Sequence, residues 1–388
     1  MSRRACLTFV TVLAVAACSS GPEKVTFPAA SSRASTSGTS TSAVTTPPSS
    51  SATALPAGVE TIATGLPVPW GLAFLPDGTA LVTLRDQGEV LHVAAGSPPV
   101  SVGHVPGVEP DGEGGLLGIA VSPAFTSDRT VFAYFTSSSD NRVIRMTFDG
   151  TTLKPGPIIV KGIAKGGIHD GGRLAFGPDG YLYISTGDAD QRDPAQDETS
   201  LNGKILRVTK DGAPAPGNPF PRGPFASLPS PGSLIWSLGH RNVEGMAWTK
   251  TGTMYASELG QNTWDELNRI EPGLNYGWPV VEGIAHRAGF VDPLVQWPTD
   301  DASPSGIAVG TDGAVYMAAL RGESLWRIPL DAKGGAGTPQ RLLQGRYGRL
   351  RTVVSAPDGR LWLVTSNTFR GTPRPGDDRI IALRLPVK

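Results

Sequence analysis

Cysteine is almost missing from this sequence. Its 388 residues include only two, Cys6 and Cys18, and both lie before residue 20. Disulfide bonds therefore play no part in the stability of the rest of the chain. A Cys-x-x-Cys-His motif, which would attach a haem covalently, is also missing. The sequence thus excludes a disulfide-stabilised scaffold and a c-type cytochrome.

Long apolar runs and an excess of charge of either sign are lacking as well. The apolar stretch from Ala5 to Ala17 is too short to span a bilayer permanently. Basic and acidic residues number 34 each, so the net charge is zero. Nothing in this balance suggests a nucleic acid or an anionic membrane surface as partner.

The first 57 residues have the composition of a leader and a tether. Arg3 and Arg4 precede the apolar stretch, as in secretory signals. Val15-Ala16-Ala17-Cys18 resembles a bacterial lipobox, which implies cleavage before Cys18 and lipidation of its thiol; an ordinary signal peptide is the alternative. The following Ser, Thr, Ala and Pro residues cannot bury enough surface to fold. We expect a signal peptide (1–17), a lipidated Cys18 with a disordered tether (18–57) and one domain (58–388), held at the extracytoplasmic face of the membrane as a monomer.

Six copies of one pattern run through the predicted domain, each an apolar strand, a tight turn and a second apolar strand. Glycine is abundant (49 residues) and Asp-Gly marks several of these turns, which is typical of hairpins between apolar runs. The first apolar positions recur at intervals of 46 to 72 residues: Leu72, Ile119, Leu174, Met246, Ile307 and Val353. This recurrence predicts an all-β fold, a six-bladed β-propeller of four-stranded antiparallel blades. We also expect the strand near residues 59–63 to pair with the last blade near residues 379–385.

Aligning the six copies predicts which residues share one end of the central channel. Residues just before the innermost strand of a blade and just after the second strand emerge at the same end of a propeller. These positions bring together four arginines, one histidine and at least one aspartate, among them His169, Asp188, Arg241, Arg321, Arg349 and Arg351. Guanidinium groups bind carboxylates in a bidentate manner and stay charged when desolvated, so the cluster suits a polyanionic ligand. His169 is then a candidate general base, which Asp188 is placed to orient.

Several segments, taken in order, resemble the soluble pyrroloquinoline quinone (PQQ)-dependent aldose dehydrogenases, the glucose/sorbosone dehydrogenase family. The resemblance covers about residues 59–385. It is carried by Gly112-Glu113-Gly114-Gly115-Leu116-Leu117-Gly118, Ile168-His169-Asp170-Gly171-Gly172-Arg173-Leu174, Gly239-His240-Arg241-Asn242, Ser257-Glu258-Leu259-Gly260-Gln261-Asn262, Asn275-Tyr276-Gly277-Trp278-Pro279, Trp297-Pro298-Thr299 and Gly348-Arg349-Leu350-Arg351.

The resemblance implies oxidation of an aldose sugar at its anomeric carbon, with PQQ and calcium as cofactors and an unidentified electron acceptor. His169 would be the base, with Asp188 and Arg241 as its catalytic partners. The cofactor would be bound by Arg241, Asn242, Arg321, Arg349, Arg351, Trp297 and Thr299. Main-chain oxygens of Gly260 and Gln261 would bind the calcium, a metal that accepts carbonyl ligands in flexible geometry.

Glu244 departs from the family pattern, which commonly has glutamine there. A carboxylate beside a trianionic cofactor should weaken binding unless an arginine neutralises it. Leu259 and Arg321 also differ from the usual residues. A non-catalytic sugar-binding or interaction protein on the same scaffold is therefore the first alternative. A calcium-dependent lactonase-type hydrolase is the second, disfavoured by the many arginines.

Overall fold

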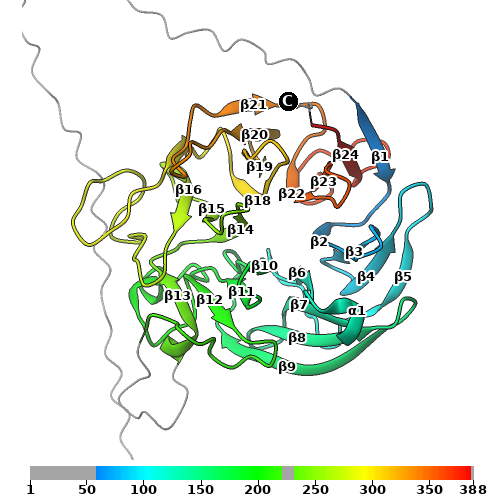
Figure 1. Ribbon diagram of the computed structural model, residues 1–388, viewed down its shortest axis with the longest axis horizontal. Helices are drawn as coiled ribbons and strands as arrows, with labels where there is room; N and C mark the ends of the chain where they lie inside the picture. Colours follow the sequence, from blue (N-terminus) through cyan, green and yellow to red (C-terminus); the bar gives the residue numbers. More distant parts are fainter. Residues whose placement is uncertain (1–57, 221–230, 386–388) are drawn as a thin grey trace, which may run out of the picture. The chain divides into compact units, whose positions relative to one another are not determined.

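The computed structural model describes residues 58–220 and 231–385 and contains six four-stranded antiparallel sheets arranged around an axis (Figure 1). This is the predicted six-bladed β-propeller. The predicted signal peptide, Cys18 and tether lie outside the described residues. Among the described residues, helix is limited to α1 (Phe125–Asp128) and two 3₁₀ turns, η1 (Asp193–Gln196) and η2 (Pro231–Leu234). None of the helices in the described residues has the length and apolar character needed to cross a bilayer.

The strands follow the chain blade by blade, with the first strand of each blade innermost (Figure 1). Blade 1 consists of β2 (Pro69–Phe74), β3 (Ala80–Leu84), β4 (Glu89–Val93) and β5 (Val100–His104). Blade 2 consists of β6 (Leu116–Val121), β7 (Thr130–Thr136), β8 (Asn141–Phe148) and β9 (Leu153–Ile163). Blade 3 consists of β10 (Leu174–Phe176), β11 (Leu182–Ser185), β12 (Lys204–Val208) and β13 (Ile235–Leu238).

Blades 4 to 6 complete the ring. Blade 4 consists of β14 (Val243–Trp248), β15 (Met254–Glu258), β16 (Trp264–Ile270) and β17 (Val295–Pro298). Blade 5 consists of β18 (Pro304–Val309), β19 (Val315–Ala319), β20 (Ser324–Ile328) and β21 (Gln340–Leu342). Blade 6 consists of β22 (Leu350–Ser355), β23 (Leu361–Thr365), β24 (Ile380–Leu383) and β1 (Val59–Ala63). The N-terminal strand β1 thus supplies the outer strand of blade 6, and Val59 pairs with Leu383 as predicted.

The repeated turns connect the two inner strands of the blades. At the first one, the Leu75 N–H donates to the Thr79 carbonyl at 2.8 Å, and the Asp77 carboxylate accepts the Thr79 N–H at 3.0 Å. Gly78 has a φ of 86°, in the left-handed region that glycine adopts at low cost. These turns reverse the chain after each innermost strand and lie at one end of the propeller. The segments that precede the innermost strands lie at the opposite end and together form its other face.

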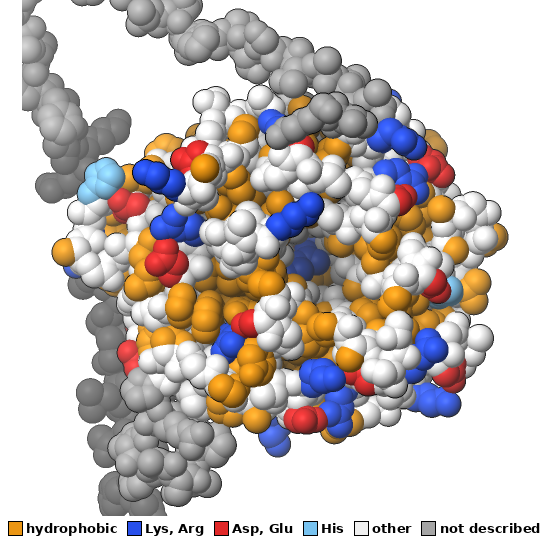
Figure 2. All heavy atoms as spheres, in the orientation of Figure 1, with side chains coloured by type: hydrophobic (Ala, Val, Ile, Leu, Met, Phe, Trp, Pro, Cys, Tyr) orange, Lys and Arg blue, Asp and Glu red, His pale blue; other side chains and the backbone are white. Residues whose placement is uncertain are grey.

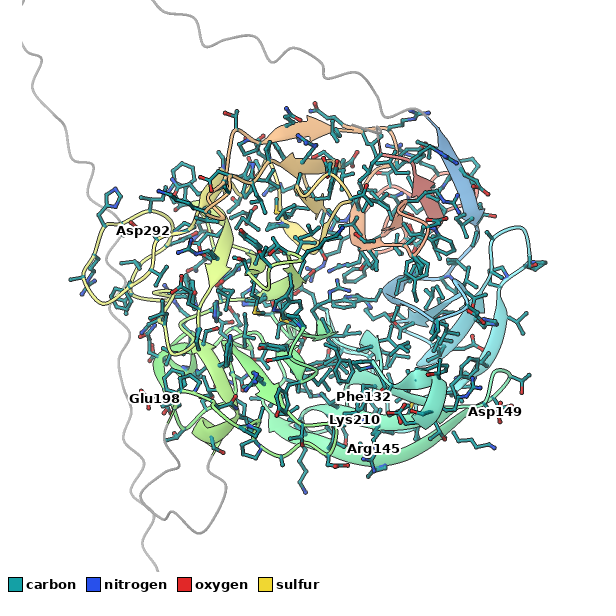
Figure 3. The ribbon with its side chains drawn as sticks, viewed as in Figure 1. Phe132, Arg145, Asp149, Glu198, Lys210 and Asp292 are labelled. Carbon is teal, nitrogen blue, oxygen red and sulfur yellow. The ribbon has the colours of Figure 1, made fainter. Side chains whose placement is uncertain are left out.

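The hydrophobic core is divided into clusters, one between each pair of neighbouring blades. Figure 3 shows side chains filling the space between the sheets, with Phe132 among those of blade 2. Its ring lies 5.5 Å from that of Phe176 in blade 3, edge to face. Because every blade buries apolar residues on both faces, the inner strands are held at fixed positions around the axis.

Candidate active site

His169 and Asp188 form a buried pair at the end of the blade 3 hairpin. His169 lies a few residues before β10 and Asp188 just after β11, so antiparallel pairing of these strands brings the two side chains together. His169 Nδ1 lies 2.7 Å from Asp188 Oδ1. The other carboxylate oxygen accepts the indole N–H of Trp278 at 2.8 Å. The imidazole is thus fixed through Nδ1, and Nε2 has no hydrogen-bond partner in the described part of the chain.

The charge of Asp188 is favoured by these contacts. Burial acts to raise its pKa, but the hydrogen bond and charge of His169, together with the N–H groups of Asp190 and Trp278, outweigh it and lower the pKa. His169 itself has a φ of 62°, a costly conformation for a residue with a side chain. Its backbone N–H donates to the Glu113 carboxylate at 3.0 Å. The fold therefore holds the histidine in one strained orientation.

Arg241 lies beside this pair and is only partly satisfied. Its Nη1 donates to the carbonyl oxygens of Gly260 (2.6 Å) and Leu259 (3.2 Å), while its Nε is buried and has no partner. Its guanidinium carbon lies 5.3 Å from the centre of the Trp278 ring. Burial lowers the pKa of Arg241, against the opposing influence of Asp188 and other carboxylates. An anion that accepted from Nε would complete the hydrogen bonding of this side chain.

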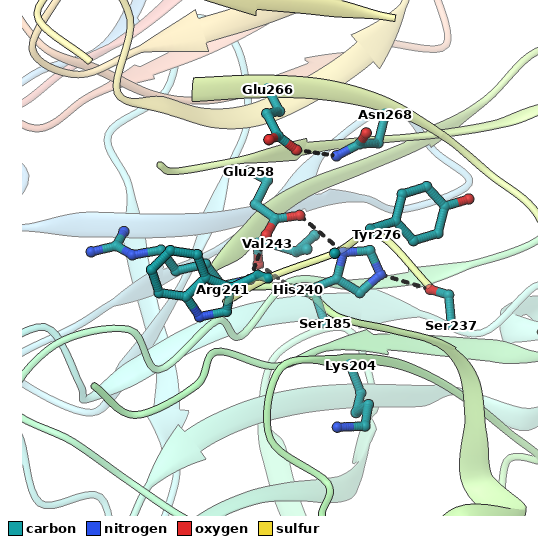
Figure 4. Close-up of polar contacts among 12 residues, drawn as sticks. Ser185, Lys204, Ser237, His240, Arg241, Val243, Glu258, Glu266, Asn268 and Tyr276 are labelled. Atoms are coloured by element: carbon teal, nitrogen blue, oxygen red, sulfur yellow. Dashed lines mark hydrogen bonds and ion pairs between the residues drawn. The ribbon is translucent and has the colours of Figure 1, made fainter. Parts of the chain in front are cut away.

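A buried histidine and glutamate support the backbone of Arg241 (Figure 4). His240 Nδ1 lies 2.9 Å from Glu258 Oε2, and its Nε2 lies 2.8 Å from Ser237 Oγ. The other oxygen of Glu258 accepts the backbone N–H of Arg241. His240 also stacks on Tyr276, with ring centroids 4.8 Å apart. His240 therefore has a packing and positioning role one residue away from Arg241.

Arg351 and Glu244 form an ion pair between blades 6 and 4. Arg351 Nη1 lies 2.5 Å from Glu244 Oε2, which also accepts the Ser305 hydroxyl at 2.6 Å. Both side chains are almost completely buried. The Nδ2 of Asn242 donates to the other Glu244 oxygen at 3.4 Å. The carboxylate that departs from the family pattern is thus neutralised by one of the arginines predicted to bind the cofactor.

Arg349 remains an unpaired cation beside this ion pair. Its Nε is buried and has no partner, and it forms no ion pair in the described residues. Burial lowers its pKa to about 10, and the neighbouring Arg351 adds to the effect. Figure 2 shows basic side chains in the hollow at the centre of the molecule. Arg349 is thus a cation whose buried Nε is available to an anionic ligand.

Three predicted residues lie apart from these contacts. Arg321 is 60% exposed and pairs with Asp300 at 2.7 Å. Trp297 is buried between blades 4 and 5, with its ring 5.7 Å from that of Trp326. Thr299 follows β17 and is partly buried. Throughout the described ranges, no hydrogen bond or ion pair joins these three to His169, Arg241 or Arg351.

The donor set fits a polycarboxylate such as PQQ. Arg241 and Arg349 each bury an Nε–H without an acceptor, a costly situation that a bound carboxylate would relieve. Asn242 supports the same region, because its Oδ1 accepts the Gly171 N–H at 2.9 Å. These unpaired donors come from blades 4 and 6, so a ligand that satisfied both would bridge the channel.

Calcium fits the arrangement less well. The carbonyl oxygens of Gly260 and Gln261 are ligands of the type that calcium takes. However, Gly260 O already accepts a guanidinium N–H, whose positive charge would oppose a divalent cation at this oxygen. The described residues also hold no group of three or more His, Cys, Asp or Glu side chains suited to a metal. Calcium at Gly260 and Gln261 stays a prediction.

Sequence reasoning missed Trp278, Glu258 and Arg173 as parts of this region. Trp278 and Arg173 lie within two of the motifs quoted above. Only the fold shows that the Trp278 indole contacts Asp188 and that the Arg173 guanidinium contacts the backbone of blade 4. The signal available beforehand was the unusual density of polar and aromatic residues in those segments. Their partners are 90 and 71 residues distant in sequence, which no local pattern indicates.

Comparison with known proteins identifies the family. The family model described as Glucose / Sorbosone dehydrogenase matches residues 66–371. An aldose sugar dehydrogenase of Escherichia coli is 32% identical over 345 residues, covering 80% of this chain and 90% of the relative. The solved structure of a PQQ-bound aldose sugar dehydrogenase from Streptomyces coelicolor shares 54% identity, with a TM-score of 0.79 over 84% of this chain and 98% of that one. This chain therefore belongs to the glucose/sorbosone dehydrogenase family.

Proposed function

We propose that the protein is a PQQ-dependent aldose sugar dehydrogenase that oxidises the anomeric carbon to the lactone. One observation carries the proposal: His169 is fixed through Nδ1 by Asp188, and its Nε2 has no hydrogen-bond partner among the described residues, beside arginines with unsatisfied donors. The family membership and the PQQ-bound relative support the same reading. PQQ, when bound, accepts the hydride that leaves the anomeric carbon together with its two electrons.

The side chains of the protein have two further roles, proton transfer and the stabilisation of developing charge. Nε2 of His169 takes the proton of the anomeric hydroxyl, and the Asp188 carboxylate stabilises the imidazolium that forms. Arg241 places a cation where negative charge develops as hydride arrives. Arg349, Arg351 and Asn242 would hold the cofactor when it is bound; Arg321, Trp297, Thr299 and a calcium ion at Gly260 and Gln261 remain predicted members of the site.

Dye reduction by the purified protein tests this function. With PQQ, calcium and a panel of aldoses, we expect dye reduction that falls about 10²–10⁴-fold in His169→Ala, since the general base is lost. The matched control is His104→Gln, because His104 is an exposed histidine that forms one ionic contact within residues 58–220 and 231–385, with Glu89 at 3.8 Å. Tight PQQ binding without turnover would favour the sugar-binding alternative. Lactone hydrolysis without dye reduction would favour the hydrolase.

The cellular setting is part of the proposal. Lipidation of Cys18 would hold the propeller outside the cytoplasmic membrane as a monomer, and the electrons would pass to an acceptor there. The leader composition and the lipobox-like Val15-Ala16-Ala17-Cys18 support this. Metabolic labelling with a radioactive fatty acid should mark the protein and should fail in Cys18→Ser; equal labelling of both forms would contradict the anchor.

A further inference from the structure

Arg173 is a buried cation without an acidic partner. Its side chain extends from blade 3 so that Nε donates to the backbone oxygen of Glu244 at 2.7 Å and the guanidinium carbon lies 4.2 Å from the ring centre of Trp70 in blade 1. The residue is 9% exposed, and Nη2 is buried with no partner. Within residues 58–220 and 231–385, neither Nη1 nor Nη2 donates a hydrogen bond and no carboxylate pairs with the group.

The carboxylate of Glu244, which acts electrostatically on Arg173, already has other partners. Glu244 pairs with Arg351 and accepts the Ser305 hydroxyl, so its negative charge already compensates that of the Arg351 guanidinium. Arg351 lies over the same tryptophan, 5.7 Å from the ring centre of Trp70. We call Trp70, Arg173, Glu244 and Arg351 the axial cluster. Its two cations and one anion leave one positive charge uncompensated, and buried charges in proteins are normally paired.

Arg173 also lines a cavity of about 420 Å³. The cavity follows the six innermost strands from Arg173 toward the ends at Phe74, Phe176 and Trp248, whereas His169 and Arg241 precede those strands. Its other lining residues are apolar except for glycine and Ser355, and none is acidic. Burial lowers the pKa of Arg173 to about 9, with Arg351 adding to the shift and Glu244 opposing it. The group is still mostly charged at neutral pH.

We propose that this end of the channel is a binding site for a small monovalent anion, such as a halide, held by the Nη1 and Nη2 groups of Arg173. A single negative charge balances the axial cluster, and the free N–H groups supply the hydrogen bonds that such an ion requires. The cavity has room for the ion and for water around it. The proposed ion site adjoins the candidate active site without including its base, because neither His169 nor Arg241 lines this cavity.

Crystals of the protein grown in sodium bromide give the direct test. We expect an anomalous bromide peak within about 3.5 Å of the Arg173 guanidinium, at hydrogen-bonding range for a halide. Water alone at this position, with bromide found only at the surface, would overturn the proposal. Because the measurement needs neither PQQ nor sugar, its result does not depend on the proposed dehydrogenase activity.

Thermal unfolding supplies a second readout. At constant ionic strength, replacing sodium isethionate with sodium chloride should raise the Tm of the wild-type protein to a plateau, since the ion binds only the folded state. Arg173→Gln should abolish the chloride effect, and Arg145→Gln, at a partly exposed arginine of β8, should keep it. Equal chloride effects in all three proteins would refute the site, as would a phosphate effect without one of chloride. Should Arg173→Gln fail to fold, the bromide peak decides.

Discussion

Glu244 shows how one residue shifts the balance between stability and ligand binding. Its carboxylate is buried and neutralises Arg351, an arginine that the resemblance assigns to the cofactor. Breaking a buried ion pair is costly because it leaves the remaining charge without a partner. In the absence of a ligand the pair therefore stabilises the propeller, and in the presence of a polyanion the same carboxylate repels it.

Glu244→Gln should separate these two effects. The amide keeps the shape and removes the charge, so we expect PQQ to bind about tenfold more tightly, equivalent to roughly 1.4 kcal/mol. The protein without PQQ should lose roughly 3 kcal/mol of unfolding free energy. Titration followed by fluorescence and urea unfolding measure the two quantities. Asp211→Asn, at an exposed carboxylate, is the control. Weaker PQQ binding by Glu244→Gln would contradict the repulsion.

Asp170, which follows His169, predicts a pH dependence of stability. Burial raises its pKa to about 6, while hydrogen bonds from Asn141 and Gly166 only partly oppose the shift. Since the folded state binds this proton more tightly than the unfolded state, stability should fall as the pH rises from about 4 to about 6. Two pKa units correspond to about 3 kcal/mol at most.

Asp170→Asn removes this titration. Relative to the wild type, the variant should gain stability between pH 4 and pH 7, by up to roughly 3 kcal/mol, because the amide cannot ionise. Urea unfolding of both proteins at the two pH values gives the difference directly. A stability difference that does not change with pH would show that Asp170 is already ionised at low pH in the folded protein.

At the scale of elements, the alignment of repeats placed strand ends correctly but not the side chains of long loops. His169 and Asp188 flank the two strands of one hairpin, so their contact follows from antiparallel pairing alone. Trp278, by contrast, lies on the long segment between β16 and β17, whose path depends on contacts with other blades. Gln196, for example, donates to the Trp278 carbonyl at 2.6 Å. Such contacts leave no periodic pattern in the sequence.

Trp278→Phe tests whether this segment positions the base. An aromatic ring, though a smaller one, is kept and the N–H to Asp188 is lost, so the carboxylate gains freedom to rotate away from His169. On the proposed function, we expect kcat to fall about tenfold with KM nearly unchanged, and the acidic limb of the pH–rate profile to move. Trp236→Phe, at a tryptophan with no contact to Asp188, is the control. Unchanged kcat and pH profile would assign Trp278 a packing role only.

At the scale of the whole molecule, the ring closes through β24, which pairs with β23 on one side and β1 on the other. All four residues of β24 are at most 1% exposed, whereas β1 buries only Ile62 and Ala63. The closure was predictable, because the last blade would otherwise leave an unpaired strand edge, which the N-terminal strand can cover. The difference in burial between them was not, since it depends on which faces the neighbouring blades cover.

Truncation should show that difference in burial as unequal losses of stability. Burying Ile380, Ile381 and Leu383 contributes roughly 5–9 kcal/mol, comparable with the whole stability of a typical domain. A chain that ends at Arg379 should therefore lose cooperative unfolding altogether. A chain that begins at Gly65 lacks β1 and the residues before it, β1 being the one described strand removed, and should retain a transition at lower Tm, while one that ends at Leu385 should behave as the wild type. Scanning calorimetry measures all three. If removal of β24 lowers the stability no more than removal of β1, closure of the ring through β24 does not hold the blades together. Each blade would then be stable independently of the others.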